Sequence, residues 1–105
     1  LWAGFPVVSI LGPHFASRVP ASLLSAVGLP ELITHNLEEY ESLALRLSLN
    51  LGELAALKTK LAQNRETEPL FDTPRFVRNL ESAFHQIWGR FVAGEMPRMI
   101  EVIEE

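Results

Sequence analysis

The apolar positions at the start of the chain form one continuous run rather than an alternation. Residues 6–11 read Pro-Val-Val-Ser-Ile-Leu, and Gly12-Pro13 follows directly. A short run that is apolar on both faces and rich in β-branched residues is typical of a buried strand in a parallel sheet. We therefore expect a buried strand over residues 6–11 that ends in a turn. Residues 29–34 form a second apolar piece, for which a brief strand and a turn both remain open.

Apolar residues then recur at helical spacing and predict a helix over residues 15–27. Gly28 is suited to the position just after a helix, and Pro30 prevents any continuation. Pro20 interrupts the pattern, because a proline inside a helix lacks a backbone donor and costs about 3 kcal/mol. We expect the helix to begin or to kink between Ser17 and Pro20.

Two further helices are predicted over residues 36–64. Asn36 with Glu39 and Asn50 with Glu53 have the spacing of helix-capping pairs, so the helices should join near Asn50. Residues three and four apart share one helix face and define the expected buried stripes. These stripes are Leu37, Tyr40, Ala44, Leu47 and Leu51 in the first part, and Leu54, Leu57 and Leu61 in the second.

The last predicted helix covers residues 73–93. Thr73 is expected as its N-cap, Pro74 as its first residue, and Gly94 as its end. The expected core stripe of this helix is Phe76, Leu80, Phe84, Ile87 with Trp88, and Phe91. Part of the stripe remains available to cover a domain outside the chain. An acidic tail containing a short Ile-Glu-Val-Ile alternation follows over residues 95–105.

The number of predicted strands is too small for the sheet that the first strand implies. A buried parallel strand needs neighbours for its backbone hydrogen bonds, and this chain offers at most one. The other strands must come from upstream sequence or from another copy of the chain. The chain also opens inside an apolar run and without Met, so we interpret Leu1 as a cut edge.

Composition excludes several classes of function. The 105 residues carry a net charge of −4, with 48% hydrophobic and 21% charged residues, as in an ordinary globular domain. There is no run of Lys and Arg for binding nucleic acid, and no apolar stretch near the ~20 residues that span a membrane. No cysteine is present, which excludes disulfides and thiolate metal sites and fits the cytosol.

The turn after the first strand is the most informative candidate site. Ligands of open α/β sheets lie beyond the carboxyl ends of the strands, and helix N-termini bind phosphate through free amides. The candidate residues there are Gly12, Pro13, His14, Ser17 and Arg18. A single glycine is no phosphate-binding fingerprint, so an ordinary turn beside a structural cation remains the alternative. The three histidines have no metal-ligand spacing, and no catalytic residue can be assigned.

Several short segments of the sequence resemble segments of one family, and they occur in the same order along the whole chain. The segments are Leu1-Trp2-Ala3-Gly4, Phe15-Ala16-Ser17-Arg18-Val19, Gly28-Leu29-Pro30-Glu31-Leu32-Ile33, Pro69-Leu70-Phe71-Asp72-Thr73 and Gln86-Ile87-Trp88. They resemble the C-terminal end of the protein O-GlcNAc transferase family, which includes the SPINDLY-type enzymes.

The resemblance implies a fold of the GT-B kind, in which two Rossmann-like lobes hold a nucleotide sugar between them. Residues 1–105 would then be a single partial domain, the end of the C-terminal lobe. We expect a predominantly helical α/β fragment with one or two short strands and four helices. The long final helix would cross back toward the N-terminal lobe.

The resemblance also implies an activity for the parent protein: transfer of N-acetylglucosamine from UDP-GlcNAc to Ser or Thr of proteins, without a metal and in the cytoplasm. The family's catalytic lysine and His-Thr-Thr motif lie upstream, so this chain alone should be inactive. Within it, only Gly12, Pro13, His14, Ser17 and Arg18 would face the cleft. The family's loop reads Gly-Glu-Thr or Gly-Asp-Thr, from which Pro13 and His14 depart.

The partners implied are the upstream catalytic lobe, tetratricopeptide repeats and acceptor proteins, with neither nucleic acid nor membrane. The isolated chain is expected to be homo-oligomeric or strand-swapped through its open strand edge. A second hypothesis is a free-standing α-helical protein-interaction module derived from such an enzyme. An upstream catalytic lobe would favour the first hypothesis, and a start codon at this point the second.

Overall fold

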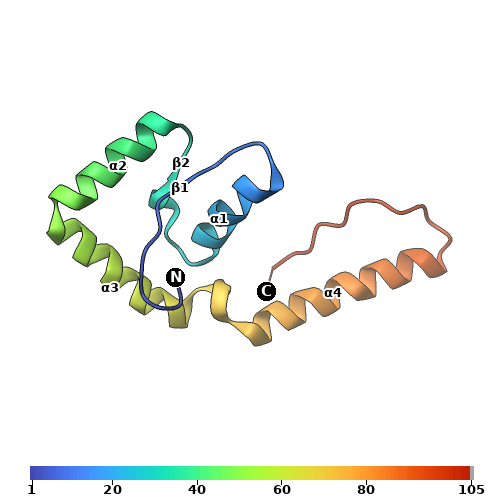
Figure 1. The fold of residues 1–105 in the computed structure, drawn as a ribbon. Helices are drawn as coiled ribbons and strands as arrows, with labels where there is room; N and C mark the ends of the chain where they lie inside the picture. The colour runs from blue at the N-terminus through green and yellow to red at the C-terminus, as the bar shows by residue number, and fades with distance from the viewer. Residues whose placement is uncertain (105) are drawn as a thin grey trace. The chain divides into compact units, whose positions relative to one another are not determined.

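A computed structural model of the chain describes residues 1–104. The chain forms two compact units, Leu1–Phe71 and the residues from Asp72 onward. The chain is mostly helical, with four helices and one two-stranded parallel sheet, as the sequence predicted (Figure 1). The first unit contains β1 (Ser9–Ile10), α1 (Phe15–Ala26), β2 (Ile33–Thr34), α2 (Leu37–Leu49) and α3 (Leu51–Thr67), with 3₁₀ turns at Pro30–Leu32 and Pro69–Phe71. The second unit contains α4 (Thr73–Val92).

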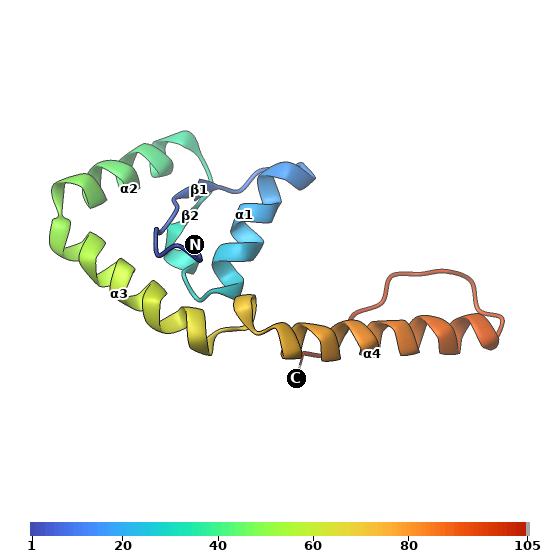
Figure 2. The same ribbon diagram turned by 60° about the horizontal axis from the view of Figure 1, so that its bottom comes forward.

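The two strands and α1 form a parallel β-α-β unit. Ser9 pairs with Ile33 and Ile10 with Thr34, and the Leu11 amide extends the ladder by donating to the Thr34 carbonyl at 2.7 Å. The second apolar piece of the sequence is therefore a 3₁₀ turn followed by a strand. In both views the strand pair lies between α1 on one side and α2 with α3 on the other (Figures 1 and 2).

The first strand is shorter and less buried than the sequence predicted. It comprises Ser9–Ile10 rather than residues 6–11, both strand residues are only half-buried, and Val7 is 48% exposed. Two strands can pair only over the length of the shorter one, and β2 is confined between a 3₁₀ turn and the helix cap at Asn36. Among residues 1–104, β1 has a neighbour on one side alone, so its apolar run is not covered on both faces.

The end of α1 agrees with the prediction and has the geometry of a Schellman motif. Gly28 has φ +74°, its amide donates to the Ser25 carbonyl at 3.1 Å, and the Leu29 amide donates to the Leu24 carbonyl at 2.8 Å. Leu24 and Leu29 are both fully buried, so the motif is joined to the core. The Asn64 side-chain amide of α3 then donates to the Gly28 carbonyl at 3.3 Å, and also to that of Val27.

The start of α1 agrees with the helical pattern predicted from residue 15. The helix begins at Phe15, with His14 as its N-cap, so Pro20 lies inside the helix rather than at its first position. Of the two alternatives for Pro20, a helix start between Ser17 and Pro20 was therefore wrong, and a kink there stays a prediction. The Ser17 hydroxyl bonds to the His14 backbone and forms the first turn before Pro20 is reached, so the proline interrupts a helix that has already begun.

The predicted caps of α2 and α3 are confirmed. The Asn36 side chain accepts from the Glu39 amide at 2.8 Å, and the Asn50 side chain accepts from the Glu53 amide at 3.1 Å. The two helices join at Asn50, which ends one and caps the next.

The core of the first unit is built from leucine and valine side chains of α1, the following turn, α2 and α3. The buried cluster comprises Leu24, Val27, Leu29, Leu32, Leu43, Leu47, Leu57 and Leu61. The stripe predicted for α3 is confirmed at Leu57 and Leu61, but that predicted for α2 was wrong except at Leu47. Leu37 is 75% and Leu51 71% exposed, because α2 turns its Leu43–Leu47 face inward and the chain starts a new helix at Leu51.

In the second unit the N-cap of α4 lies one residue before the predicted cap, so the helix begins at Thr73 rather than at Pro74. The Asp72 carboxylate, rather than Thr73, accepts from the Arg75 amide, at 3.1 Å. The helix ends as predicted at Gly94, which has φ +76°. Residues 95–104 have no regular secondary structure (Figure 2). Glu104 of this tail lies 3.7 Å from the Arg75 guanidinium.

The prediction that the aromatic stripe of α4 belongs to a core was wrong. No residue of α4 is buried. The stripe residues are all exposed: Phe76, Leu80, Phe84, Ile87, Trp88 and Phe91. The half-buried residues of α4 lie on a different face: Arg75, Asn79, Ala83, Gln86 and Arg90.

The Schellman glycine gives a first test of this fold. Gly28→Ala should lower the free energy of unfolding by roughly 1–3 kcal/mol, because an L-residue resists positive φ. In addition, its Cβ would lie 2.7 Å from Asn64 Nδ2. The matched control is Gly52→Ala in α3, where the nearest atom would be 3.5 Å away and alanine favours the helix. Equal losses from the two variants in urea denaturation would contradict the assigned geometry.

Candidate functional site

The turn between β1 and α1 brings together most of the candidate residues. It begins at Leu11, the last residue bonded to β2, and ends at Phe15, the first residue of α1. It therefore lies at the carboxyl end of a parallel strand, where open α/β sheets bind ligands. The helix that follows directs its N-terminal amides and the positive end of its dipole toward this turn.

The Ser17 hydroxyl holds the turn in place. It accepts from the His14 amide at 3.2 Å and donates to the His14 carbonyl at 2.8 Å. The Ser17 backbone also bonds within the turn, since its carbonyl accepts from the Gly12 amide at 3.3 Å. Because the hydroxyl makes both of these bonds to the backbone, Ser17 acts on this turn by positioning His14.

Gly12 is required by the close approach of Ser17. A Cβ at Gly12 would lie 2.5 Å from Ser17 Oγ and 2.9 Å from Ser17 Cβ. Glycine at this position is thus explained by packing within the turn. Pro13 and His14 are exposed at the tip of the turn.

Arg18 lies next to the turn but does not join the contacts around Ser17. Its side chain is exposed and makes no hydrogen bond or ion pair within residues 1–104. It lines a separate groove that extends along α1 toward β2. The structure therefore groups Gly12, His14 and Ser17 and leaves Arg18 available to a ligand beside them.

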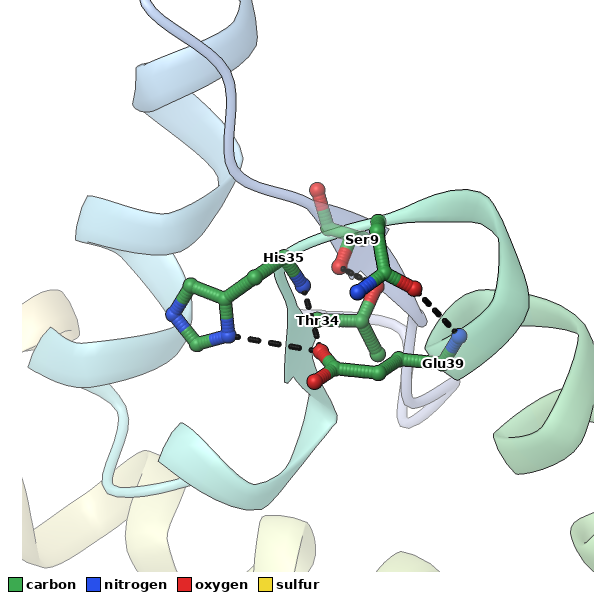
Figure 3. A network of polar contacts seen from close by, with 5 residues as sticks. Ser9, Thr34, His35 and Glu39 are labelled. Carbon is green, nitrogen blue, oxygen red and sulfur yellow. Dashed lines mark hydrogen bonds and ion pairs between the residues drawn. The ribbon is translucent and has the colours of Figure 1, made fainter.

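A second set of polar residues follows the carboxyl end of β2 (Figure 3). Thr34 is buried, and its hydroxyl donates to the Ser9 carbonyl at 2.8 Å. The Glu39 carboxylate accepts from the His35 amide at 2.8 Å and lies 3.4 Å from His35 Nδ1. The sequence signal for this set is the capping pair of Asn36 and Glu39. That spacing does not reveal that the set lies at the same end of the sheet as the turn.

One carboxylate of the first unit, that of Glu31, has a shifted pKa, and it belongs to neither of the two sets of residues described above. Burial raises the pKa of Glu31, but three other effects together outweigh it: the hydrogen bond from Lys60 Nζ at 2.8 Å, a backbone hydrogen bond and the positive charge of Lys60. The net pKa is therefore lowered from its ordinary value of 4.5. Both side chains remain partly exposed, so the pair is a surface ion pair of modest strength.

Two further findings concern metals and membranes. Within residues 1–104, no three side chains of His, Cys, Asp or Glu are grouped in a way that would hold a metal ion. None of the helices in the same range is long and apolar enough to cross a lipid bilayer.

The contact between Gly12 and Ser17 can be tested by a double-mutant cycle. Gly12→Ala should lower the free energy of unfolding by about 1–2 kcal/mol, because it displaces the hydroxyl that bonds to His14. In a Ser17→Gly background, which removes both clashing atoms, the same substitution should cost much less. Coupling of roughly 1 kcal/mol or more is expected. Additive losses in urea denaturation would show that the two residues do not depend on each other.

The ion pair of Glu31 and Lys60 predicts a pH-dependent contribution to stability. The carboxyl pKa is lower in the folded state, so the contribution is present above pH 4.5 and is lost as the pH falls through the lowered value. Glu31→Gln should reduce the free energy of unfolding at neutral pH by about 0.5 kcal/mol. This difference should vanish in acid. Glu41→Gln, at an exposed carboxylate of α2, is the control, and an equal pH profile for both variants would contradict the assignment.

Comparison with known proteins gives a consistent result. The model of the family described as Glycosyl transferase family 41 matches residues 1–80. The chain is 42% identical over 105 residues to the probable UDP-N-acetylglucosamine–peptide N-acetylglucosaminyltransferase SEC of Arabidopsis thaliana, covering 99% of this chain and 11% of that protein. It is 35% identical to the probable enzyme SPINDLY of Petunia hybrida (100% and 12%) and 36% identical to a Caenorhabditis elegans UDP-N-acetylglucosamine–peptide N-acetylglucosaminyltransferase (90% and 8%). The chain thus spans 8 to 12% of the length of these three relatives.

Proposed function

The chain belongs to glycosyl transferase family 41, and we propose that it is part of an enzyme that transfers N-acetylglucosamine from UDP-GlcNAc to Ser or Thr hydroxyls of proteins. The observation that carries this proposal is the match of 99% of the chain, at 42% identity, to a relative named for that transfer. Because the chain spans so little of its relatives, the activity belongs to a larger protein. The chain alone is inactive in this proposal.

In that larger protein the chain forms the end of the C-terminal, nucleotide-sugar-binding lobe of a GT-B enzyme. The parallel β1-α1-β2 unit supports this placement, because such units build Rossmann-like sheets. The free edge of β1 takes a further strand, either from the rest of the lobe or, in the isolated chain, from a second copy.

The turn of Gly12, Pro13 and His14, with Ser17 and Arg18, borders the nucleotide-sugar cleft in this proposal. Its position at the carboxyl end of β1 and at the start of α1 supports this role. The free amides of a helix N-terminus stabilise the charge that develops on a departing diphosphate. The transfer needs no metal, and the parent enzyme works in the cytoplasm.

The exposed aromatic stripe of α4 covers the N-terminal lobe of the parent. The exposure of six large apolar side chains on one helix supports an interface. The same stripe supports the alternative function, a free-standing interaction module, in which it would bind another protein. Acceptor proteins and tetratricopeptide repeats would be the partners of the parent enzyme.

A chimera tests the proposed function. The matching segment of the Arabidopsis relative is replaced by these 105 residues, and transfer from UDP-GlcNAc to an acceptor protein is measured. The chimera should transfer N-acetylglucosamine, whereas the isolated chain should not. Circular dichroism of the chimera verifies its fold, and a chimera carrying Gly28→Ala is the control in which the graft is destabilised. Transfer by the isolated chain, or a folded chimera without activity, would contradict the proposal.

A further inference from the structure

A groove with polar and apolar walls runs between α1 and β2. Four residues at helical spacing line it on the α1 side: Arg18, Ala21, Ser22 and Ser25. Ile33 and His35 line it on the β2 side. Its volume is about 620 Å³, within the usual range of ligand-binding clefts.

The polar groups of the groove are distributed unevenly along its length. Arg18 supplies a guanidinium without a partner in residues 1–104, whereas Ser22 and Ser25 supply hydroxyls farther along the helix. His35 also lines the groove, but Glu39 lies 3.4 Å from its ring nitrogen and offsets a positive charge there. The groove therefore offers one uncompensated cation, followed by neutral hydrogen-bonding groups and apolar surface.

This charge pattern favours a singly charged group over a polyanion. Glu38 and Glu39 in the first turn of α2 lie close to His35 in the chain and repel a ligand with several negative charges. A nucleic acid or an anionic membrane is recognised by many cations together, which the groove lacks. One carboxylate beside Arg18 fits, because a single charge-assisted hydrogen bond suffices to hold it.

The groove is also continuous with the turn at the end of β1. Leu11, which precedes the turn, and Arg18, which follows it, both line the groove. From Arg18 to Ser25 the wall of α1 extends seven residues, or about 10 Å. That length matches about three residues of extended polypeptide. A chain molecule placed at the turn can therefore continue along the groove.

From these observations we propose that the groove binds an extended segment of the acceptor protein, with an Asp or Glu side chain on Arg18. The hydroxyls of Ser22 and Ser25 bond to the backbone of that segment, and Ala21 and Ile33 contact its apolar side chains. This inference rests on the proposed function, because it identifies the bound polypeptide as the acceptor. It gives the enzyme a preference for acceptors with an acidic residue near the modified hydroxyl.

The test uses the full 105-residue chain and two capped heptapeptides in an NMR titration without nucleotide. One peptide has a central Ser flanked by Asp residues, and the other has Asn in place of each Asp. The Asp peptide should shift the amide signals of Ser22, Ser25 and His35 saturably, with a dissociation constant on the order of 1 mM. The Asn peptide should bind about tenfold more weakly, because it lacks the charged bond to Arg18.

Two matched substitutions identify the contribution of Arg18. Arg18→Gln should weaken binding of the Asp peptide about tenfold and leave the Asn peptide unchanged. Lys58→Gln, which removes the same charge from the exposed surface of α3, should change binding less than about twofold. The double variant Ser22→Ala/Ser25→Ala should weaken both peptides alike. Circular dichroism of each variant verifies its fold.

The outcomes separate this inference from the proposed function. Equal binding of the two peptides, equal losses from Arg18→Gln and Lys58→Gln, or shifts outside the groove would each overturn it. An active chimera together with any of these results leaves the transfer activity standing without this subsite. Specific binding of the Asp peptide together with a folded but inactive chimera would instead refute the transfer, and with it the identification of the peptide as acceptor.

Discussion

The first unit depends on the short parallel pairing of β1 with β2, and Thr34 takes part in that pairing twice. Its carbonyl accepts from the Leu11 amide at 2.7 Å, and its buried hydroxyl donates to the Ser9 carbonyl at 2.8 Å. A ladder of two residue pairs makes few backbone bonds, so this added bond between partly buried groups is a substantial part of its strength. The turn at Gly12 and the residues around His35 both follow this pairing. The turn and the residues around His35 lie at the same end of the sheet because the two strands are parallel.

Between the strands, α1 is fixed mainly by contacts at its two ends. At the start, Ser17 bonds to the backbone of His14, and at the end Gly28 adopts positive φ. Asn64 from α3 then binds the carbonyls released there. With both ends fixed in this way, and with Leu24 fully buried, the helix accommodates a proline that an isolated peptide would not.

The sequence predicts local features of this fold well and non-local features poorly. Helix ends at Asn36, Asn50 and Gly28 were predicted because capping is a bond between neighbours in the chain. The buried face of α2 and the length of β1 were not, because both depend on which segments pack against them. The candidate site shows the same division. The turn at Gly12 is predicted by the adjacent residues Gly12 and Pro13, whereas its proximity to His35 depends on strand pairing.

The two units differ in how much of their stability they can supply themselves. The first has a buried core of leucine and valine, whereas α4 buries no residue and exposes an aromatic stripe. Helices in proteins gain most of their stability from packing an apolar face, and α4 leaves its apolar stripe exposed. The first unit therefore has what it needs to hold the candidate site. For α4, by contrast, a surface that covers its exposed stripe would add the packing that the helix lacks.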